Sequence, residues 1–257
     1  MMDALYLLRN SAHDDFEIRH SLRSLERHAP WVRKVWIFGD RPKFLGGDIS
    51  VIEHVPEGAL APVLGVKTPV TNFFLLNVLS SLIPELTPEY LHLSDDFFLL
   101  RDLPIAEARK DRYLEEMSGQ ARGRGVWRES LWRTHDLLKS LGYTGYNFET
   151  HVPTYLTKKR VLEAYCEFKA HATEDRHAGM MGLTAILNHA LAREKMSLVK
   201  LSEENSRCGF WRTPPSYAEV AAQSEGKTFF NFDDGAWGEG IRKFLAERFP
   251  EKSRFEQ

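Results

Sequence analysis

Tyr90-Leu91-His92-Leu93-Ser94-Asp95-Asp96-Phe97-Phe98-Leu99-Leu100 is the stretch on which the interpretation of this sequence depends. Its first five residues alternate, with two leucines on one face and Tyr90, His92 and Ser94 on the other. This period of two predicts a half-buried β-strand. A pair of aspartates follows at the point where the strand ends, and an apolar block comes after them.

Asp95 and Asp96 need compensation, because burying two unpaired carboxylates is costly. In α/β proteins ligands bind beyond the carboxyl ends of the strands. A divalent cation that holds a diphosphate would satisfy both carboxylates at this position. An alternative interpretation is a helix start, with Asp95 as its cap and Asp96 favoured by the helix dipole.

The residues before this strand predict a βαβ unit. Residues 4–8 and 35–38 are short apolar runs, and an amphipathic helix lies between them. Asp14 and Glu17 predict a capping box at its start, and Pro30 ends it.

Asp40 lies just after the second strand, and further elements follow it. Residues 49–55 predict a third strand and residues 58–69, rich in glycine and proline, a loop. Thr71 or Asn72 is expected to cap the next helix. The order of these elements is that of a sheet that binds nucleotide sugars.

The second half predicts helices over residues 161–168, 180–191 and 241–249. A late strand, residues 228–232, ends in Asp233 and Asp234, so this acidic pair is expected at the same edge of the sheet as the first.

Cations and aromatic residues alternate in the middle of the chain. Guanidinium groups grip phosphates and indoles stack on bases or sugars, so this segment suggests a phosphate or acceptor contact. The alternative interpretation is an exposed, arginine-rich loop that tryptophans anchor to the core. The residues are Arg122, Arg124, Trp127, Arg128, Trp132, Arg133 and His135.

Composition restricts the class of protein. The chain has 257 residues, 43% of them hydrophobic, and a net charge of −2, which argues against a general polyanion binder. Two cysteines are too few for a disulfide framework or a thiolate zinc site. No apolar run approaches the roughly 20 residues of a membrane span, and no signal peptide is evident at the start. We therefore expect a cytoplasmic protein without a membrane span.

Four segments resemble conserved regions of the Stealth family, which includes bacterial capsular polysaccharide phosphotransferases and the animal lysosomal N-acetylglucosamine-1-phosphotransferase. Residues 17–33 resemble its second region, and residues 93–98 its Leu-Asn-Asp-Asp-Phe-Phe signature. Residues 150–153 match the His-x-Pro of its third region, and residues 230–256 resemble its fourth. The four occur in the family's order and span nearly the whole chain.

The resemblance implies a GT-A-like α/β fold, in which helices flank a mostly parallel central sheet. It implies one catalytic domain over residues 1–257, with residues 1–105 as the nucleotide-sugar-binding half and 106–257 as the acceptor-side half. It also implies a UDP-sugar donor, a divalent metal, and Asp96 and His151 at catalytic positions. Arg133 lies one residue away from the spacing of a family arginine.

Three segments depart from the family pattern. Residues 6–11 read Tyr-Leu-Leu-Arg-Asn-Ser where the family has Tyr-Thr-Trp-Val-Asp-Gly-Ser-Asp. Ser94 replaces the asparagine before the two aspartates, and residues 72–77 replace a histidine-rich stretch. The donor or the bond that breaks is therefore open.

We hypothesise a transferase that delivers a sugar, or a sugar-1-phosphate, from a UDP-sugar to a hydroxyl acceptor on a glycan. Asp95 and Asp96 would hold Mg²⁺ or Mn²⁺ and the diphosphate, and His151 would be the general base. The remaining predicted contacts are Asn10, Arg19, Arg23 and Asp40 to the nucleotide and its phosphates, and Arg122, Arg124, Trp127, Arg128 and Asp233 to acceptor or phosphate.

Two alternatives remain at this stage. The cationic and aromatic segment suggests a glycosyltransferase of hydroxylated DNA bases, whose acceptor base would have to be flipped out of the duplex. A protein of another class, a degenerate transferase that binds a glycan or a nucleic acid without turnover, would explain the altered segments. Attack at the anomeric carbon releases UDP and attack at the β-phosphorus releases UMP; the altered segments favour UDP.

Overall fold

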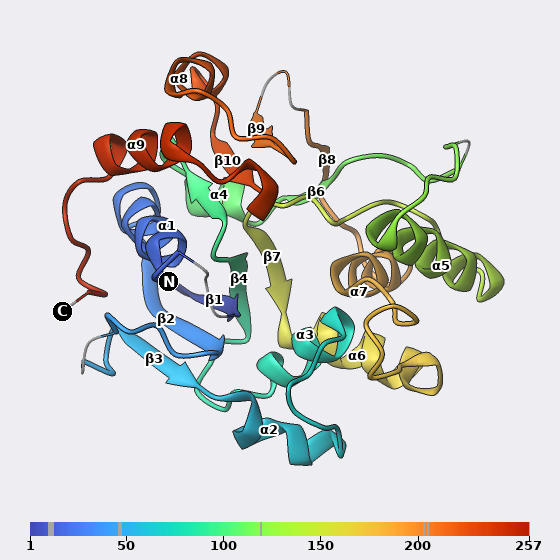
Figure 1. Cartoon of the computed structure of the whole chain (residues 1–257). Helices are drawn as coiled ribbons and strands as arrows, with labels where there is room; N and C mark the ends of the chain where they lie inside the picture. The colour runs from blue at the N-terminus through green and yellow to red at the C-terminus, as the bar shows by residue number, and fades with distance from the viewer. Residues whose placement is uncertain (10–12, 46–47, 119, 203, 205, 257) are drawn as a thin grey trace.

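The computed structural model describes residues 1–9, 13–45, 48–118, 120–202, 204 and 206–256. Its centre is a five-stranded sheet in the order β3-β2-β1-β4-β7 (Figure 1). The pairs β3·β2, β2·β1 and β1·β4 are parallel, and β7 runs antiparallel to β4. The strands are β1 Met2–Leu8, β2 Val32–Gly39, β3 Ile52–Val55, β4 Glu89–Ser94 and β7 Thr154–Thr157.

Helices cover both faces of this sheet. The helix α1 (Phe16–His28) packs on one face through Ile18, Leu22 and Leu25. On the other face α3 (Phe73–Ser81), α6 (Lys158–Phe168) and α7 (Gly182–Leu191) build a second core. The α/β fold with helices around a mostly parallel sheet is confirmed.

This two-sided covering corrects the prediction of a half-buried strand. Tyr90 and His92 lie on the face of β4 that we expected to meet solvent, yet they are 0% and 4% exposed. The α3–α6–α7 layer covers that face, so β4 is a central strand buried on both sides.

Smaller sheets extend the molecule beyond the central one. β5 (Phe97–Leu99) pairs antiparallel with β10 (Phe229–Phe232), which pairs with β9 (Arg207–Phe210). β6 (Asp111–Tyr113) pairs with β8 (Leu198–Lys200). The other elements are α2 Glu57–Leu64, α4 Ile105–Ala108, α5 Val126–Ser140, η1 Lys169–His171, α8 Tyr217–Ser224, η2 Asp234–Ala236 and α9 Glu239–Arg248.

Of the two helix caps predicted from the sequence, one is confirmed and one is wrong. Asn72 caps α3 as expected, accepting a bond from the Leu75 backbone N–H at 3.1 Å. The predicted capping box of α1 is wrong, because Asp14 pairs with Lys43 at 2.6 Å and the helix cap is Asp15, without a side-chain cap bond.

Two segments expected as loops are helices. Residues 58–69 contain most of α2, because Leu60 and Leu64 pack against the core and Ala61 is buried. The cationic and aromatic segment is mostly helix α5, with Leu131 fully buried.

No helix within the described ranges is both long and apolar enough to cross a membrane.

The buried carboxylate of Asp3 ties three elements together at the amino end of β1. Arg33 donates two bonds to it, each 2.8 Å long, and the Trp36 indole N–H donates a third at 2.9 Å. The backbone N–H of Thr87 donates a fourth at 3.1 Å, which connects the segment before β4 to β1. Asp3 is 0% exposed, so these four bonds are what compensates its charge.

We expect Asp3→Ala to lower the free energy of unfolding by about 3 kcal/mol, since it leaves a cation and two buried N–H groups without their partner. Urea denaturation followed by circular dichroism measures this change. The control is Asp14→Ala, whose ion pair with Lys43 is 79% exposed on both sides and should leave the unfolding midpoint unchanged. Equal effects of the two substitutions would contradict the role given to Asp3.

Candidate active site

The site lies where the sheet topology changes direction. From β1 the chain passes to β2 and β3 on one side, and β4 lies on the other side of β1. Strands β1 and β4 are parallel neighbours, with Leu7 opposite Ser94. The loops after them therefore diverge, and this opens a crevice at the carboxyl ends of the strands.

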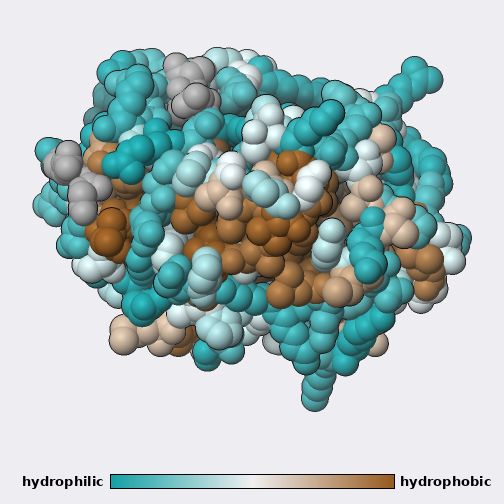
Figure 2. Space-filling model, turned by 90° about the horizontal axis from the view of Figure 1, so that it is seen from below, coloured by the Kyte–Doolittle hydropathy of each residue, from teal (hydrophilic) through white to brown (hydrophobic). Residues whose placement is uncertain are grey.

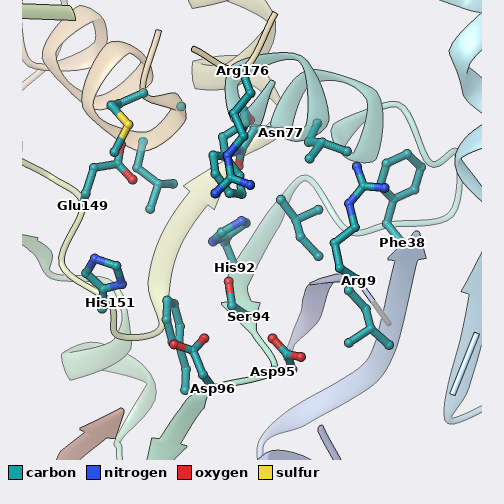
Figure 3. Close-up of a pocket in the computed structure, with 18 of the residues that line it drawn as sticks. Arg9, Phe38, Asn77, His92, Ser94, Asp95, Asp96, Glu149, His151 and Arg176 are labelled. Atoms are coloured by element: carbon teal, nitrogen blue, oxygen red, sulfur yellow. The ribbon is translucent and has the colours of Figure 1, made fainter. Parts of the chain in front are cut away.

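A cavity of about 400 Å³ fills this crevice (Figure 3). The apolar part of its wall comes from β1, β2, α3, β5 and the start of α7. Seen from the side of α2 and α3, the molecule has a hollowed hydrophobic area framed by hydrophilic side chains (Figure 2). The polar residues that line the cavity are Arg9, Glu57, Asn77, His92, Ser94, Asp95, Asp96, Glu149, His151 and Arg176.

Asp95 and Asp96 form the turn between β4 and β5 and line the cavity together. Burial raises the pKa of Asp95 to about 6, and the charge of Asp234 adds to this. Burial also raises the pKa of Asp96 well above its usual range, and the charges of Asp95 and Glu17 add to this. These acidic groups repel one another, so the pair favours a bound cation.

Asp234 reaches this cluster because β10 pairs with β5, which follows the aspartate turn directly. The second acidic pair was expected at the same edge of the sheet as the first, but β10 belongs to a separate sheet with β5 and β9; Asp234 is nevertheless close enough for its charge to act on both Asp95 and Asp96. Its neighbour Asp233 instead caps η2, accepting bonds from Arg212 and Ala236. Asp233 is not among the residues that line the cavity.

The donor set fits a divalent ion that a ligand completes. Among the described residues no three histidine, cysteine or acidic side chains stand together as a ready-made metal site. Mg²⁺ commonly binds one or two carboxylates and takes its other ligands from substrate phosphates and water. Asp95 and Asp96, crowded by acidic groups, have the chemistry for this mode.

His151 also lines the cavity, in the segment before β7 and on the side of Asp96 (Figure 3). Its backbone has a φ of 53°, an uncommon left-handed conformation for this residue type. The imidazole lies 6.3 Å from the Phe97 ring and 5.4 Å from the Trp211 ring, measured between centroids. Burial, reinforced by Arg207, lowers the pKa of His151 to about 4, so the ring is neutral at pH 7.

Glu149 is a cavity residue that the sequence analysis missed. One of its oxygens accepts the backbone N–H of Thr184 at 2.9 Å, in the first turn of α7. Burial raises its pKa to about 7. The signal in the sequence was an acidic residue within the run Asn147-Phe148-Glu149-Thr150, two positions before His151.

Two arginines also line the cavity without having been predicted. Arg9 forms an ion pair with Glu57 at 3.1 Å and donates a bond to the Val70 carbonyl. Arg176 lies over the Phe73 ring, 5.3 Å from its centroid, and is exposed.

Other predicted contacts lie away from the cavity. Arg19 and Arg23 pair with Glu256 at 3.4 and 2.7 Å, because the rows of α1 that carry them face the C-terminal segment. Their expected contact with a nucleotide stays a prediction, since neither arginine lines the cavity. Asp40 follows β2, where its N–H donates to Leu8, but it does not line the cavity. Asn10 lies outside the described residues.

Helix α5 brings only one of its predicted contacts to the cavity, Trp127. Arg133 follows Trp127 by six residues, so it lies about 120° away around the helix and on a different face. Arg133 donates to Ser130 and to the carbonyl of His177 and does not line the cavity, so its expected catalytic role has no support from the cavity and stays a prediction.

The other cations of this segment do not line the cavity either. Arg122 pairs with Asp136 at 2.6 Å and Arg128 with Glu115 at 3.3 Å. Arg124, just before α5, is exposed. Acidic neighbours on the surface hold two of them, and their expected contacts with acceptor or phosphate stay predictions.

Parts of the sequence are similar to known proteins. No protein-family model matches the chain. An exopolysaccharide phosphotransferase of Streptomyces coelicolor is 36% identical over 90 residues, which is 33% of this chain and 15% of that protein. The N-acetylglucosamine-1-phosphotransferase subunits alpha/beta of Homo sapiens and Mus musculus are each 46% identical over 46 residues, 16% of this chain and 4% of theirs. Over these segments the chain is similar to sugar phosphotransferases. It spans only a small part of the length of these curated relatives.

Solved structures resemble this chain in fold. The galactosyltransferase LgtC, in complex with donor and acceptor sugar analogues, matches with a TM-score of 0.51 at 13% identity over 98% of both chains. An active-site mutant of LgtC matches with a TM-score of 0.50 at 14% identity, again over 98% of both chains. The GT-A-like fold predicted from the sequence is thereby confirmed.

The buried carboxyl group of Glu149 predicts a pH effect on stability. Its pKa is raised in the folded state, so the folded protein keeps a proton that the unfolded chain has lost. The contribution of Glu149 to stability should fall as the pH rises from about 4.5 to about 7 and change little beyond, since this group is then ionised in both states. Glu149→Gln still accepts the Thr184 bond and should remove this part of the pH dependence.

Thermal unfolding of both proteins from pH 4.5 to 8.5 measures the difference. Parallel curves for the wild type and Glu149→Gln would show that Glu149 does not titrate in this window.

Proposed function

We propose that this Stealth-like chain is a nucleotide-sugar-dependent transferase that moves a sugar from a UDP-sugar to a hydroxyl group of a glycan. The observation that carries the proposal is the Asp95–Asp96 pair at the β1–β4 switch point. Buried, mutually repelling carboxylates line a cavity there together with two groups able to accept a proton, Glu149 and His151.

Donor binding follows from the charges around the cavity. Asp95 and Asp96 would hold Mg²⁺ or Mn²⁺, which supplies charge neutralisation for a leaving diphosphate. The nucleotide would lie along the carboxyl ends of β1 and β2, where Leu8, Arg9 and Phe38 line the wall. Arg176 at the rim would add a positive charge near the phosphates.

The reaction needs a base on the acceptor side. The acceptor oxygen forms a bond to the anomeric carbon of the donor sugar, and the bond from that carbon to the β-phosphate oxygen breaks. UDP leaves with the electron pair of that bond, and the acceptor proton passes to the protein. The ionised fraction of Glu149, whose pKa is raised to about 7, can accept this proton at pH 7, and the neutral ring of His151, with a pKa of about 4, is the weaker base of the two.

Transfer of sugar rather than sugar phosphate agrees with the cations at the site. Attack on phosphorus places charge on the equatorial phosphate oxygens, which enzymes stabilise with several cations. Among the described residues, the arginines that line the cavity are Arg9 and Arg176, and Glu57 already pairs with Arg9. This favours UDP over UMP as the released nucleotide, although the curated relatives are named phosphotransferases.

The other candidate functions have less support. Two of the arginines expected to grip a nucleic-acid acceptor are held by Asp136 and Glu115. A binding module without turnover would have no use for two candidate bases facing the acidic pair. A glycan acceptor is therefore the proposal that we retain.

The nucleotide released separates the two chemistries. Incubation with UDP-glucose, UDP-galactose or UDP-N-acetylglucosamine, Mn²⁺ and oligosaccharide acceptors should yield UDP together with a glycosylated acceptor, resolved by anion-exchange chromatography and mass spectrometry. UMP with a phosphodiester-linked product would overturn the proposed bond cleavage. Absence of turnover, together with retained UDP binding, would favour the binding module.

Asp96→Asn should abolish the metal response, because it removes one anionic oxygen ligand from the pair. We expect Mn²⁺ with UDP to raise the melting temperature of the wild type but not of this variant, and turnover to fall by about 10²–10³-fold. The control is Asp48→Asn, an exposed loop residue that binds Ser50 and should retain both properties. Full turnover of Asp96→Asn would refute the metal-binding assignment.

A further inference from the structure

The inner wall of the cavity carries polar atoms that lack a partner. Within the described part of the chain, both ring nitrogens of His92 and the amide oxygen of Asn77 have no hydrogen bond. His92 is 4% exposed and Asn77 is 2% exposed, and both line the cavity. Buried polar atoms without a partner are costly and rare in folded proteins, so these three call for a ligand.

His92 and Asn77 approach the same space from two elements (Figure 3). His92 lies on the face of β4 that also carries Ser94, and two residues of strand place it roughly 7 Å further from the aspartate turn. Asn77 projects from α3, where its amide nitrogen donates to the Phe73 carbonyl at 2.8 Å. That bond fixes the amide and leaves its oxygen for a ligand.

The start of α7 is shaped around Asn77. A Cβ atom at position 182 would lie 2.6 Å from the Asn77 amide nitrogen, so Gly182 allows the close packing that holds this side chain in place. The amide is therefore fixed on two sides, by Phe73 and by Gly182. A fixed acceptor of this kind selects the geometry of what it binds.

The chemistry of these atoms favours hydroxyl groups. Burial lowers the pKa of His92 to about 4, so at neutral pH the ring offers one donor and one acceptor. Asn77 offers a second acceptor. A hydroxyl group both donates and accepts, whereas a carboxylate only accepts and would meet the Asn77 oxygen unfavourably.

We propose that Asn77 and His92 form a donor-sugar subsite that binds neighbouring hydroxyl groups of an uncharged hexose. This assignment rests on the proposed function, because the diphosphate held at Asp95 and Asp96 would direct the sugar toward this wall. The apolar side chains of Leu76 and Leu183, which also line the cavity, would pack against the carbons of the sugar ring.

A sugar carrying a carboxylate is the competing ligand, since Arg176 lies at the rim. It is less favoured because Arg176 is exposed, whereas the buried unpartnered atoms are those of Asn77 and His92. UDP-glucuronate therefore belongs in the test beside UDP-glucose, UDP-galactose and UDP-N-acetylglucosamine.

The test compares the affinity for each UDP-sugar with that for UDP, measured by calorimetry with Mn²⁺. The wild type should bind one of the neutral UDP-sugars more tightly than UDP and more tightly than UDP-glucuronate. His92→Leu and Asn77→Leu should each reduce this preference over UDP about tenfold, with the Kd of UDP unchanged. The melting temperature of the free His92→Leu protein should not fall, since the substitution removes unpartnered buried atoms.

Asn188→Leu is the matched control. The Asn188 side chain bonds to the Tyr146 N–H and carbonyl and to the Thr184 carbonyl, away from the cavity. Its replacement should lower the melting temperature and leave the sugar preference intact. If either cavity variant fails to fold, His92→Gln and Asn77→Gln replace them and should retain part of the preference.

The outcomes separate this inference from the function on which it rests. If UDP binds but the variants keep the full preference, the subsite assignment is wrong and the transferase proposal stands. Tightest binding of UDP-glucuronate, or no neutral sugar binding better than UDP, also overturns it. If UDP itself does not bind with Mn²⁺ or Mg²⁺, the proposed function fails together with the subsite.

Discussion

The repulsion among buried carboxylates at the end of β4 is the constraint around which the site is organised. Asp95 and Asp96 lie in one turn, and the charges of Glu17 and Asp234 act on them from α1 and from the start of η2. Such a cluster is unfavourable in the empty protein, and a divalent cation with a diphosphate converts it into a binding site. Natural proteins accept this cost where function requires it.

The rest of the fold supplies the rigidity that keeps the cluster together. Helices cover both faces of the central sheet, so β1 and β4 are fixed in register by buried side chains. Pairing of β5 with β10 joins the C-terminal part of the chain to the strand that leaves the aspartate turn. Two segments distant in sequence, residues 94–97 and 229–234, therefore contribute charge to one site.

The sequence was informative where the signal was local. Alternation around Leu91 and Leu93, the adjacent aspartates and the Asn72 cap all follow from nearest neighbours, and they were found. What failed depended on tertiary packing: α2 forms in a segment rich in glycine and proline because its apolar residues meet the core. The roles of Arg19 and Arg23 could not be foreseen, since their partner Glu256 lies more than 230 positions away. Glu149 and His92 became candidates only when the cavity showed that they line it.

The proposed function depends on where a metal ion and a nucleotide bind. Crystals grown with Mn²⁺ and UDP, measured at a wavelength where manganese scatters anomalously, locate the ion without prior assumptions. We expect one anomalous peak within coordination distance of Asp95 or Asp96, with the diphosphate completing its ligands and the nucleotide along the ends of β1 and β2. A manganese ion or a nucleotide bound elsewhere, with the cavity between β1 and β4 free of both, would contradict the central claim.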